Sequence, residues 1–277
     1  MVNLKKVFII MKTKQKISIS IFIIIFFLGL AGNGIFTLGH LGAFAQNTDF
    51  PKTVPCTVLV ELFVQENCLT CPTAEFCLED LAWEYGTTKF ILVQEHLWGD
   101  GYDTEETNAR YNWYVGDGKK GTPDVFINGL TKRLQGLHCD CVEGNYECYK
   151  NAIDEELTRP SLLEISASKT THPDPLPNII IEGTVKNISD ITLKDLAVCG
   201  MLGKEGDEPG LYNYIQDIFT FQNMPPLLPG AAFSFKFVPE ISLTPESEID
   251  EEEEVLHLVI FIQNLETKEI LQALYVE

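Results

Sequence analysis

The sequence predicts an α/β domain followed by an all-β sandwich, with an export segment in front of both. Three observations support this prediction: a basic and then apolar N-terminus, alternating strand-like and helix-like patterns up to residue 160, and strand patterns alone after it. Hydrophobic residues make up 45% of the 277 positions, enough to bury a core, so intrinsic disorder of the whole chain is not expected.

The export segment is predicted at residues 1–45. Lysines precede the apolar stretch Ile17–Leu30, and the small-residue exit Ala43-Phe44-Ala45 follows it, as in a signal peptide. The uncharged stretch continues past the most apolar part. Two alternatives therefore remain: a signal peptide that is cleaved, or an uncleaved membrane anchor at residues 17–38. In both cases we expect an exported protein, periplasmic, cell-surface or extracellular, where disulfides persist.

The α/β domain is predicted at residues 46–160. Its first helix has Pro72 in its first turn, where a missing N–H costs nothing, and its last helix ends before Pro160. Asn128-Gly129 is a hairpin turn signal. The predicted elements are strands at 57–64 and 90–93, helices at 71–85 and 104–115, a hairpin of 124–129 with 131–137, and a helix at 144–158.

The all-β part is predicted at residues 161–277. Turn signals such as Pro225-Pro226 and Pro229-Gly230 separate candidate strands that show no helical period. This pattern predicts a sandwich of immunoglobulin-like type. The acidic run Glu246–Glu254 is interpreted as a solvated loop, because no calcium-ligand spacing accompanies it. The candidate strands are 161–169, 178–187, 192–202, 214–221, 231–238, 255–263 and 270–276.

The charge of the chain excludes one class of function. Lys and Arg number 20 against 40 Asp and Glu, and residues 1–45 hold five of the lysines and no acid. From Gln46 onward 15 bases therefore face 40 acids, a net charge of −25. A chain this acidic repels phosphate, so no nucleic-acid partner is expected.

Cys68-Leu-Thr-Cys71 is the motif that carries chemistry. It lies between the first predicted strand and the first helix, where free helix N–H groups stabilise a thiolate and lower the pKa of Cys68. Cys68 is then the attacking thiolate and Cys71 resolves the mixed disulfide. A purely structural disulfide stays open as the alternative. Zinc would need a second pair, so no metal and no cofactor are expected.

Several stretches carry a resemblance to known proteins: Val60–Phe63, Asn67–Pro72, Glu95-His96 and Gly121–Asp124 in the first part, and Gly183–Ser189 and Ile262–Ala273 in the second. The chain resembles the thioredoxin-like superfamily, and exported bacterial outer-membrane proteins that join a C-x-x-C-P thioredoxin-like domain to a C-terminal β domain. The resemblance implies a cis Thr122–Pro123 bond whose loop faces the dithiol and holds substrate.

Two further residues are candidates for the site. The resemblance makes Glu61 a candidate proton acceptor, because it lies near, but one residue away from, the position where thioredoxins keep a buried carboxylate that helps deprotonate the resolving cysteine. A strand carboxylate that points to solvent is the equally open alternative. His96 closes the second strand and is a candidate for substrate binding, or an ordinary packed polar group. Asn67 and the pair Leu69-Thr70 depart from thioredoxin, so the direction of the redox reaction is not carried over.

The six other cysteines have mainly structural interpretations. A local disulfide among Cys139, Cys141 and Cys148 is favoured over a zinc site that includes His138, with Cys56 or Cys77 as the partner of the remaining thiol. Cys199 lies in an apolar strand and is interpreted as a small core residue.

Two functions are weighed from these features. The leading hypothesis is an exported thiol–disulfide oxidoreductase-like protein that exchanges disulfides with protein thiols and disulfides and with an unidentified redox partner. The alternative is a non-catalytic cell-surface or periplasmic binding module in which Cys68–Cys71 is a structural disulfide.

Overall fold

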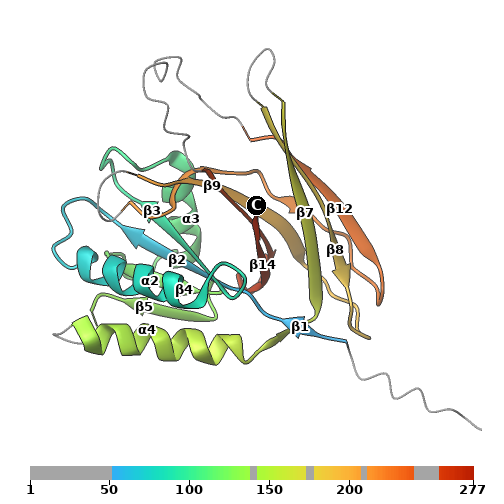
Figure 1. Ribbon diagram of the computed structural model, residues 1–277, viewed down its shortest axis with the longest axis horizontal. Helices are drawn as coiled ribbons and strands as arrows, with labels where there is room; N and C mark the ends of the chain where they lie inside the picture. The colour runs from blue at the N-terminus through green and yellow to red at the C-terminus, as the bar shows by residue number, and fades with distance from the viewer. Residues whose placement is uncertain (1–51, 138–141, 173–177, 207–210, 240–255) are drawn as a thin grey trace, which may run out of the picture. The chain divides into compact units, whose positions relative to one another are not determined.

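The helix-containing half of the chain follows the local patterns closely. The computed structural model describes residues 52–277 without 138–141, 173–177, 207–210 and 240–255 (Figure 1). The predicted export signal, the predicted anchor, the acidic run Glu246–Glu254 and three of the candidate zinc ligands, His138, Cys139 and Cys141, lie outside these residues. The elements of this half are β1 (Val54–Pro55), β2 (Val58–Val64), α2 (Cys71–Tyr85), β3 (Phe90–His96), α3 (Glu105–Val115), β4 (Asp124–Ile127), β5 (Lys132–Gln135) and α4 (Val142–Leu157).

The start of α3 shows how local chemistry sets an element boundary. The Thr104 hydroxyl accepts the Thr107 N–H at 3.1 Å, and the Thr107 hydroxyl accepts the Thr104 N–H at 3.1 Å. This reciprocal capping box satisfies two backbone donors that the first helical turn leaves free. Thr107 also donates its hydroxyl to the carbonyl of His96 at 2.8 Å, which fixes α3 to the end of β3.

After residue 160 the described chain consists of strands. β8 and β14 begin and end where the sequence predicts, and the other long strands differ from their predicted bounds by a few residues. The elements are β6 (Pro160–Ser161), β7 (Leu163–His172), β8 (Asn178–Asn187), β9 (Leu196–Lys204), β10 (Tyr214–Ile218), β11 (Gln222–Asn223), β12 (Ala232–Phe237), β13 (Leu256–Asn264) and β14 (Ile270–Val276).

One nine-stranded sheet runs through both halves, in the order β14-β13-β9-β10-β3-β2-β4-β5 with β11 on β9. β2 and β3 are parallel, and β10 joins β3 in parallel through Tyr214 opposite Gln94. Asn213 adds two bonds at this junction: its carbonyl accepts the Gln94 N–H at 3.2 Å, and its side chain donates to the Leu92 carbonyl at 2.7 Å. Strands far apart in the sequence therefore share one hydrogen-bonded sheet.

The predicted fold class, a thioredoxin-like α/β domain followed by a separate immunoglobulin-like sandwich, is wrong. The described chain is mostly β, with three helices, and β9, β10, β13 and β14 extend the sheet of the first half. Only β7, β8 and β12 form a second sheet of some length. The prediction failed because period-two patterns locate strands but do not say which distant strands pair. A domain boundary at residue 160 stays a prediction.

The helices cover the two faces of the β2–β3 region and so position the site. α2 and α4 pack together on one face, over Val60, Leu62 and Leu92 (Figure 1). α3 lies on the other face, where Tyr111 and Tyr114 pack against Phe63 and Phe126. Alternate residues of β2 consequently face different helices. Within the described residues no helix has the length and apolar character needed to cross a bilayer.

Candidate functional site

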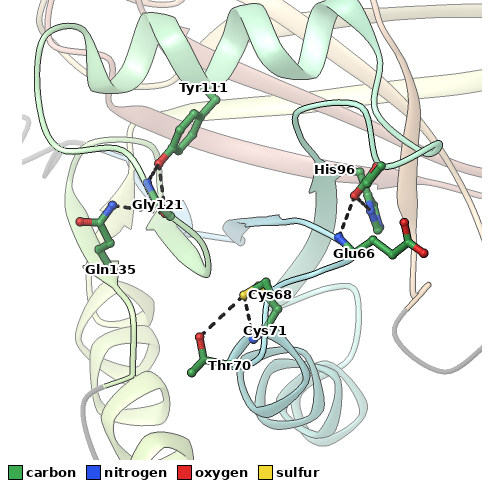
Figure 2. Close-up of a disulfide and its surroundings, with 9 residues drawn as sticks. Glu66, Cys68, Thr70, Cys71, His96, Tyr111, Gly121 and Gln135 are labelled. Carbon is green, nitrogen blue, oxygen red and sulfur yellow. Dashed lines mark hydrogen bonds and ion pairs between the residues drawn. A yellow bond between two sulfur atoms is a disulfide. The ribbon is translucent and has the colours of Figure 1, made fainter.

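A disulfide joins Cys68 and Cys71, with their Cα atoms 5.4 Å apart, between the end of β2 and the start of α2 (Figure 2). The two sulfurs differ in their access to solvent. Cys68 is half-buried, whereas Cys71 is the first residue of α2, is only 1% exposed and packs into the core beneath the helix. A partner sulfur can therefore reach Cys68, while Cys71 is shielded.

The sulfur of Cys68 occupies the N-terminal end of α2. Thr70 is the N-cap residue but its side chain caps no backbone N–H, and the first turn contains no acidic residue. Instead the Cys71 N–H donates to Cys68 Sγ at 3.1 Å, and the Thr70 hydroxyl lies 3.7 Å from the same sulfur. Free N–H groups at a helix start favour negative charge, so this position stabilises a Cys68 thiolate once the disulfide is reduced.

The Thr122–Pro123 peptide bond is cis, which confirms the predicted isomer. Pro123 is buried and Thr122 half-buried, directly before the pairing of Asp124 in β4 with Phe63 in β2. The loop is held at Gly121, whose surroundings Figure 2 shows. The Gly121 N–H donates to the Tyr111 hydroxyl at 3.0 Å, and Gln135 donates to the Gly121 carbonyl at 3.2 Å. The loop therefore lies at the end of β2 from which the chain continues to Cys68.

His96 is tied to the loop that carries Cys68. Its Nδ1 lies 2.7 Å from Asp100 Oδ2, and the same oxygen accepts the Glu66 N–H at 3.2 Å (Figure 2). The ring is 6% exposed, packs 5.2 Å from the Tyr102 ring, and its buried Nε2 has no hydrogen-bond partner among the described residues. These contacts support a positioning role for His96, and substrate binding by it stays a prediction.

Glu61 does not meet the disulfide. Its neighbours Val60 and Leu62 face the core that contains Cys71, so Glu61 points to the opposite face of β2. There its carboxylate is hydrogen-bonded by Arg110 Nε and, at 2.6 Å, by the Tyr114 hydroxyl. It is fully buried, so the solvent-facing alternative is wrong. The structure gives Glu61 no contact through which it would take a proton from Cys71.

A second carboxylate completes this buried cluster. Glu95 Oε1 lies 3.8 Å from Arg110 Nε, and both carboxylate oxygens of Glu95 are buried without a hydrogen-bond partner in the described chain. Burial, and then the charge of Glu61, raise the pKa of Glu95 well above its ordinary value. Burial by itself lowers the pKa of Arg110, but the charges of Glu61, Tyr114 and Glu95 outweigh burial and raise this pKa above its ordinary value. The cluster consequently places Glu95, whose pKa is raised, beside the Arg110–Glu61 ion pair.

Three of the other cysteines are poor nucleophiles. Burial, the largest cause in each case, raises the pKa of Cys56 and Cys77 to about 11 and that of Cys199 to about 12, so these thiols stay protonated. Cys199 lies in β9 and packs in the core, as predicted. Cys148 bonds to no described cysteine, and the predicted pairing of Cys139 and Cys141 lies outside the described residues. No cluster of metal-ligating side chains occurs in the part that the structure describes.

Sequence reasoning missed the residues that support the candidates. Arg110 gave no signal, because one arginine in a weak helical pattern looks like a surface residue. Asp100 gave a weak signal, because it is a carboxylate four positions after His96 in the sequence. Tyr111 gave no signal of its role, although its hydroxyl accepts the Gly121 N–H and donates to Asp124 at 2.8 Å.

Comparisons with known proteins inform the fold. No protein-family model matches the chain, and no curated protein matches it. Among solved structures, HBP35 of Porphyromonas gingivalis matches with a TM-score of 0.59 and 17% identity, over 80% of this chain and 74% of its own. Bacteroides uniformis beta-glucuronidase and Listeria innocua beta-glucosidase match at TM-scores of 0.29 and 0.23, each at 20% identity. Those cover 41% and 43% of this chain and 12% and 16% of their own, too little similarity for any argument.

The match to HBP35 also corrects the resemblance drawn from the sequence. The described chain is mostly β, with three helices, and the solved structure that it matches over most of its length is similar in this β-rich architecture. The assignment to the thioredoxin-like superfamily, and to outer-membrane proteins built on such a domain, is therefore withdrawn. At 17% identity the likeness concerns the fold alone: this chain has a β-rich fold similar to that of HBP35.

Proposed function

We propose that this chain is an exported protein that exchanges thiols and disulfides with protein substrates through Cys68 and Cys71. The observation that carries the proposal is the asymmetry of the pair: Cys68 is half-buried with a helix N–H on its sulfur, and Cys71 is 1% exposed. The basic and apolar N-terminus supports an exported location, where such a pair meets protein disulfides.

The exchange proceeds through a mixed disulfide at Cys68. In the reduced pair the Cys68 thiolate attacks one sulfur of a substrate disulfide, forms a Cys68–substrate bond and releases the other substrate sulfur as a thiolate. The Cys71 thiolate then attacks Cys68 Sγ, restores the Cys68–Cys71 disulfide and releases the second substrate thiolate. Two electrons pass from the pair to the substrate, and a dithiol reductant returns them. Reversed, the same steps oxidise a substrate dithiol.

The second candidate is a non-catalytic module in which Cys68–Cys71 fastens β2 to α2. The observation that favours it is the packing of Cys71 within the core under α2, where a disulfide also holds structure. This candidate predicts a lower unfolding temperature on reduction and no mixed disulfide with any substrate.

Turnover and trapping by the full 277-residue chain separate the two candidates. With a dye-labelled glutathione disulfide and dithiothreitol as reductant, we expect turnover that Cys68→Ser reduces to the uncatalysed background. Cys71→Ser should accumulate a mixed disulfide, located at Cys68 by peptide mass. Cys77→Ser is the matched control, because its buried thiol is a poor nucleophile, and should retain turnover. A rate unchanged by Cys68→Ser would refute the proposal.

A further inference from the structure

Apolar side chains line the outer face of α2, beginning beside the disulfide. Phe76 is 57% exposed and Trp83 79% exposed, which is unusual for side chains of this size. They are seven residues apart and therefore lie on one face of the helix, with the exposed Pro72 one turn before Phe76. We call Leu69, Pro72, Phe76 and Trp83 the α2 stripe.

The α2 stripe is continuous with the proposed redox pair. Leu69 lies between the two cysteines and is 97% exposed. Pro72 follows Cys71 directly, so a chain that meets Cys68 Sγ also meets these two side chains. From Pro72 to Trp83 the helix rises about 17 Å, the length of about five residues of extended polypeptide. The stripe can therefore hold a short segment next to a substrate cysteine.

The charges beside the α2 stripe have one sign. α2 contains Glu75, Glu79, Asp80 and Glu84 and no basic residue. Glu84 pairs with Lys150, and burial raises the pKa of Glu75 to about 7 and that of Glu79 in the same direction. The charge on this helix therefore comes mainly from Asp80, which is exposed and forms no ion pair with another described residue. Glu66, just before Cys68, is exposed and acidic as well. This arrangement attracts cationic segments and repels anionic ones.

We propose that the α2 stripe docks a cysteine-containing polypeptide segment in which apolar side chains and lysines or arginines stand within about five residues of the cysteine. The proposal rests on the thiol–disulfide exchange proposed above and names its substrate class. A second copy of this chain is the less favoured occupant, because each copy carries a net charge of −20 and the face itself is acidic.

The test compares two substrates on the full chain. One is a small disulfide, dye-labelled glutathione disulfide, and the other is a ten-residue peptide disulfide with two leucines and two lysines beside its cysteine. Phe76→Gln and Trp83→Gln should each lower kcat/KM for the peptide about tenfold, since each aromatic buries substantial apolar area on docking. Turnover of glutathione disulfide should be unchanged. Leu228→Gln, at a 59% exposed leucine outside the stripe, is the matched control and should affect neither substrate.

Charge is tested with a second peptide in which glutamates replace the two lysines. Its kcat/KM should be several-fold lower at low salt and approach that of the lysine peptide at 0.5 M salt, as screening predicts. Normal peptide turnover by both stripe variants, while glutathione disulfide is turned over, would overturn the docking surface and leave the proposed function standing. No turnover of either substrate by the unmodified chain would overturn both. If sedimentation finds a dimer that Trp83→Gln dissociates, the occupant is a second copy and the proposal is wrong.

Discussion

Replacing Arg110 with methionine should destabilise the fold by about 3–5 kcal/mol, because it leaves the buried carboxylate of Glu61 charged and unpaired. Arg110 Nε donates to Glu61, and its terminal nitrogens donate to Tyr114 at 2.7 Å and to Gln263 at 3.3 Å. Its guanidinium also lies 4.9 Å from the centre of the Tyr114 ring and 5.0 Å from that of Phe261. These contacts connect α3 with β2 and β13, so the loss affects both halves of the chain.

Urea unfolding of the full chain, followed by circular dichroism, measures this loss. The double variant Glu61→Met/Arg110→Met removes both charges and should recover most of the stability, because well-packed apolar residues can replace a buried ion pair with little loss. Lys132→Met is the matched control: it breaks the exposed pair with Glu155 and should leave the midpoint close to that of the unmodified chain. A loss below about 1 kcal/mol for Arg110→Met, or a double variant no more stable than the single one, would refute the reasoning.

Three further predictions concern single residues. Burial, and then the charge of Glu79, raise the pKa of Glu75 from 4.5 to about 7, so the folded chain holds a proton there that the unfolded chain has released, and stability falls as pH rises through this window. Glu75→Gln should remove this slope: free energies of unfolding from urea titrations should coincide near pH 4, and at pH 7.5 the variant should be more stable by about 1–2 kcal/mol, after allowance for solvent screening. The pKa of Glu95 is raised in the same direction, so Glu95→Gln should be more stable than the unmodified chain at pH 8 and equal to it near pH 4 in thermal unfolding. A variant less stable than the unmodified chain at pH 8 would contradict the raised pKa. Gly129 has φ +66°, and an added Cβ would lie 2.1 Å from the Lys268 carbonyl oxygen. Gly129→Ala should therefore lower the free energy of unfolding by about 1–3 kcal/mol. An unchanged urea midpoint would show that the turn at Gly129 and the turn at Lys268 separate easily.

Local structure was predictable from the sequence because local forces decide it. The helix predicted at residues 71–85 is α2, and the strand predicted at 270–276 is β14. The same holds for the position of Cys68–Cys71, since a strand followed by a helix start is visible in the pattern. Pairing was not predictable: nothing in residues 214–218 indicates that Tyr214 lies beside Gln94 in one sheet. Long-range register depends on packing that no short window contains.

The candidate site was predictable in part, for the same reason. The disulfide and the cis Thr122–Pro123 bond agree with the sequence, whereas Glu61 was expected near Cys71 and lies on the other face of β2. A one-residue offset in a strand reverses the face of the sheet to which a side chain points. The offset of Glu61 by one residue therefore argues against a role as proton acceptor for Cys71.

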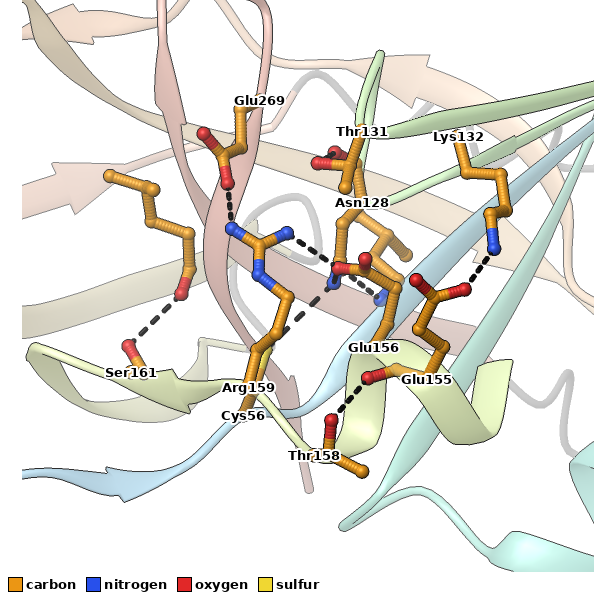
Figure 3. A network of polar contacts seen from close by, with 12 residues as sticks. Cys56, Asn128, Thr131, Lys132, Glu155, Glu156, Thr158, Arg159, Ser161 and Glu269 are labelled. Carbon is orange, nitrogen blue, oxygen red and sulfur yellow. Dashed lines mark hydrogen bonds and ion pairs between the residues drawn. The ribbon is translucent and has the colours of Figure 1, made fainter. Parts of the chain in front are cut away.

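Polar groups of residues 128–130 and 268–270 hold the hairpin turn of the first half against the turn between β13 and β14. Leu130 N–H donates to the Lys268 carbonyl at 3.2 Å, and Ile270 N–H donates to the Asn128 carbonyl at 3.0 Å. The Asn128 side chain also donates to Glu156 at 3.0 Å, and Glu156 accepts Arg159 at 2.8 Å (Figure 3). The end of α4, the hairpin turn and the β13–β14 turn thus share one polar network.

The pairing of β10 with β3 has a consequence for how this protein can be rearranged. Without the strands that follow residue 160, β3 would be a bare sheet edge with the apolar Ile91 and Val93 uncovered, a template for aggregation. We therefore do not expect the helix-containing half to fold by itself when it is expressed alone or fused to another protein. We expect both halves to unfold in one transition, so that the Cys68–Cys71 disulfide keeps its surroundings only while the strands that complete its sheet are folded.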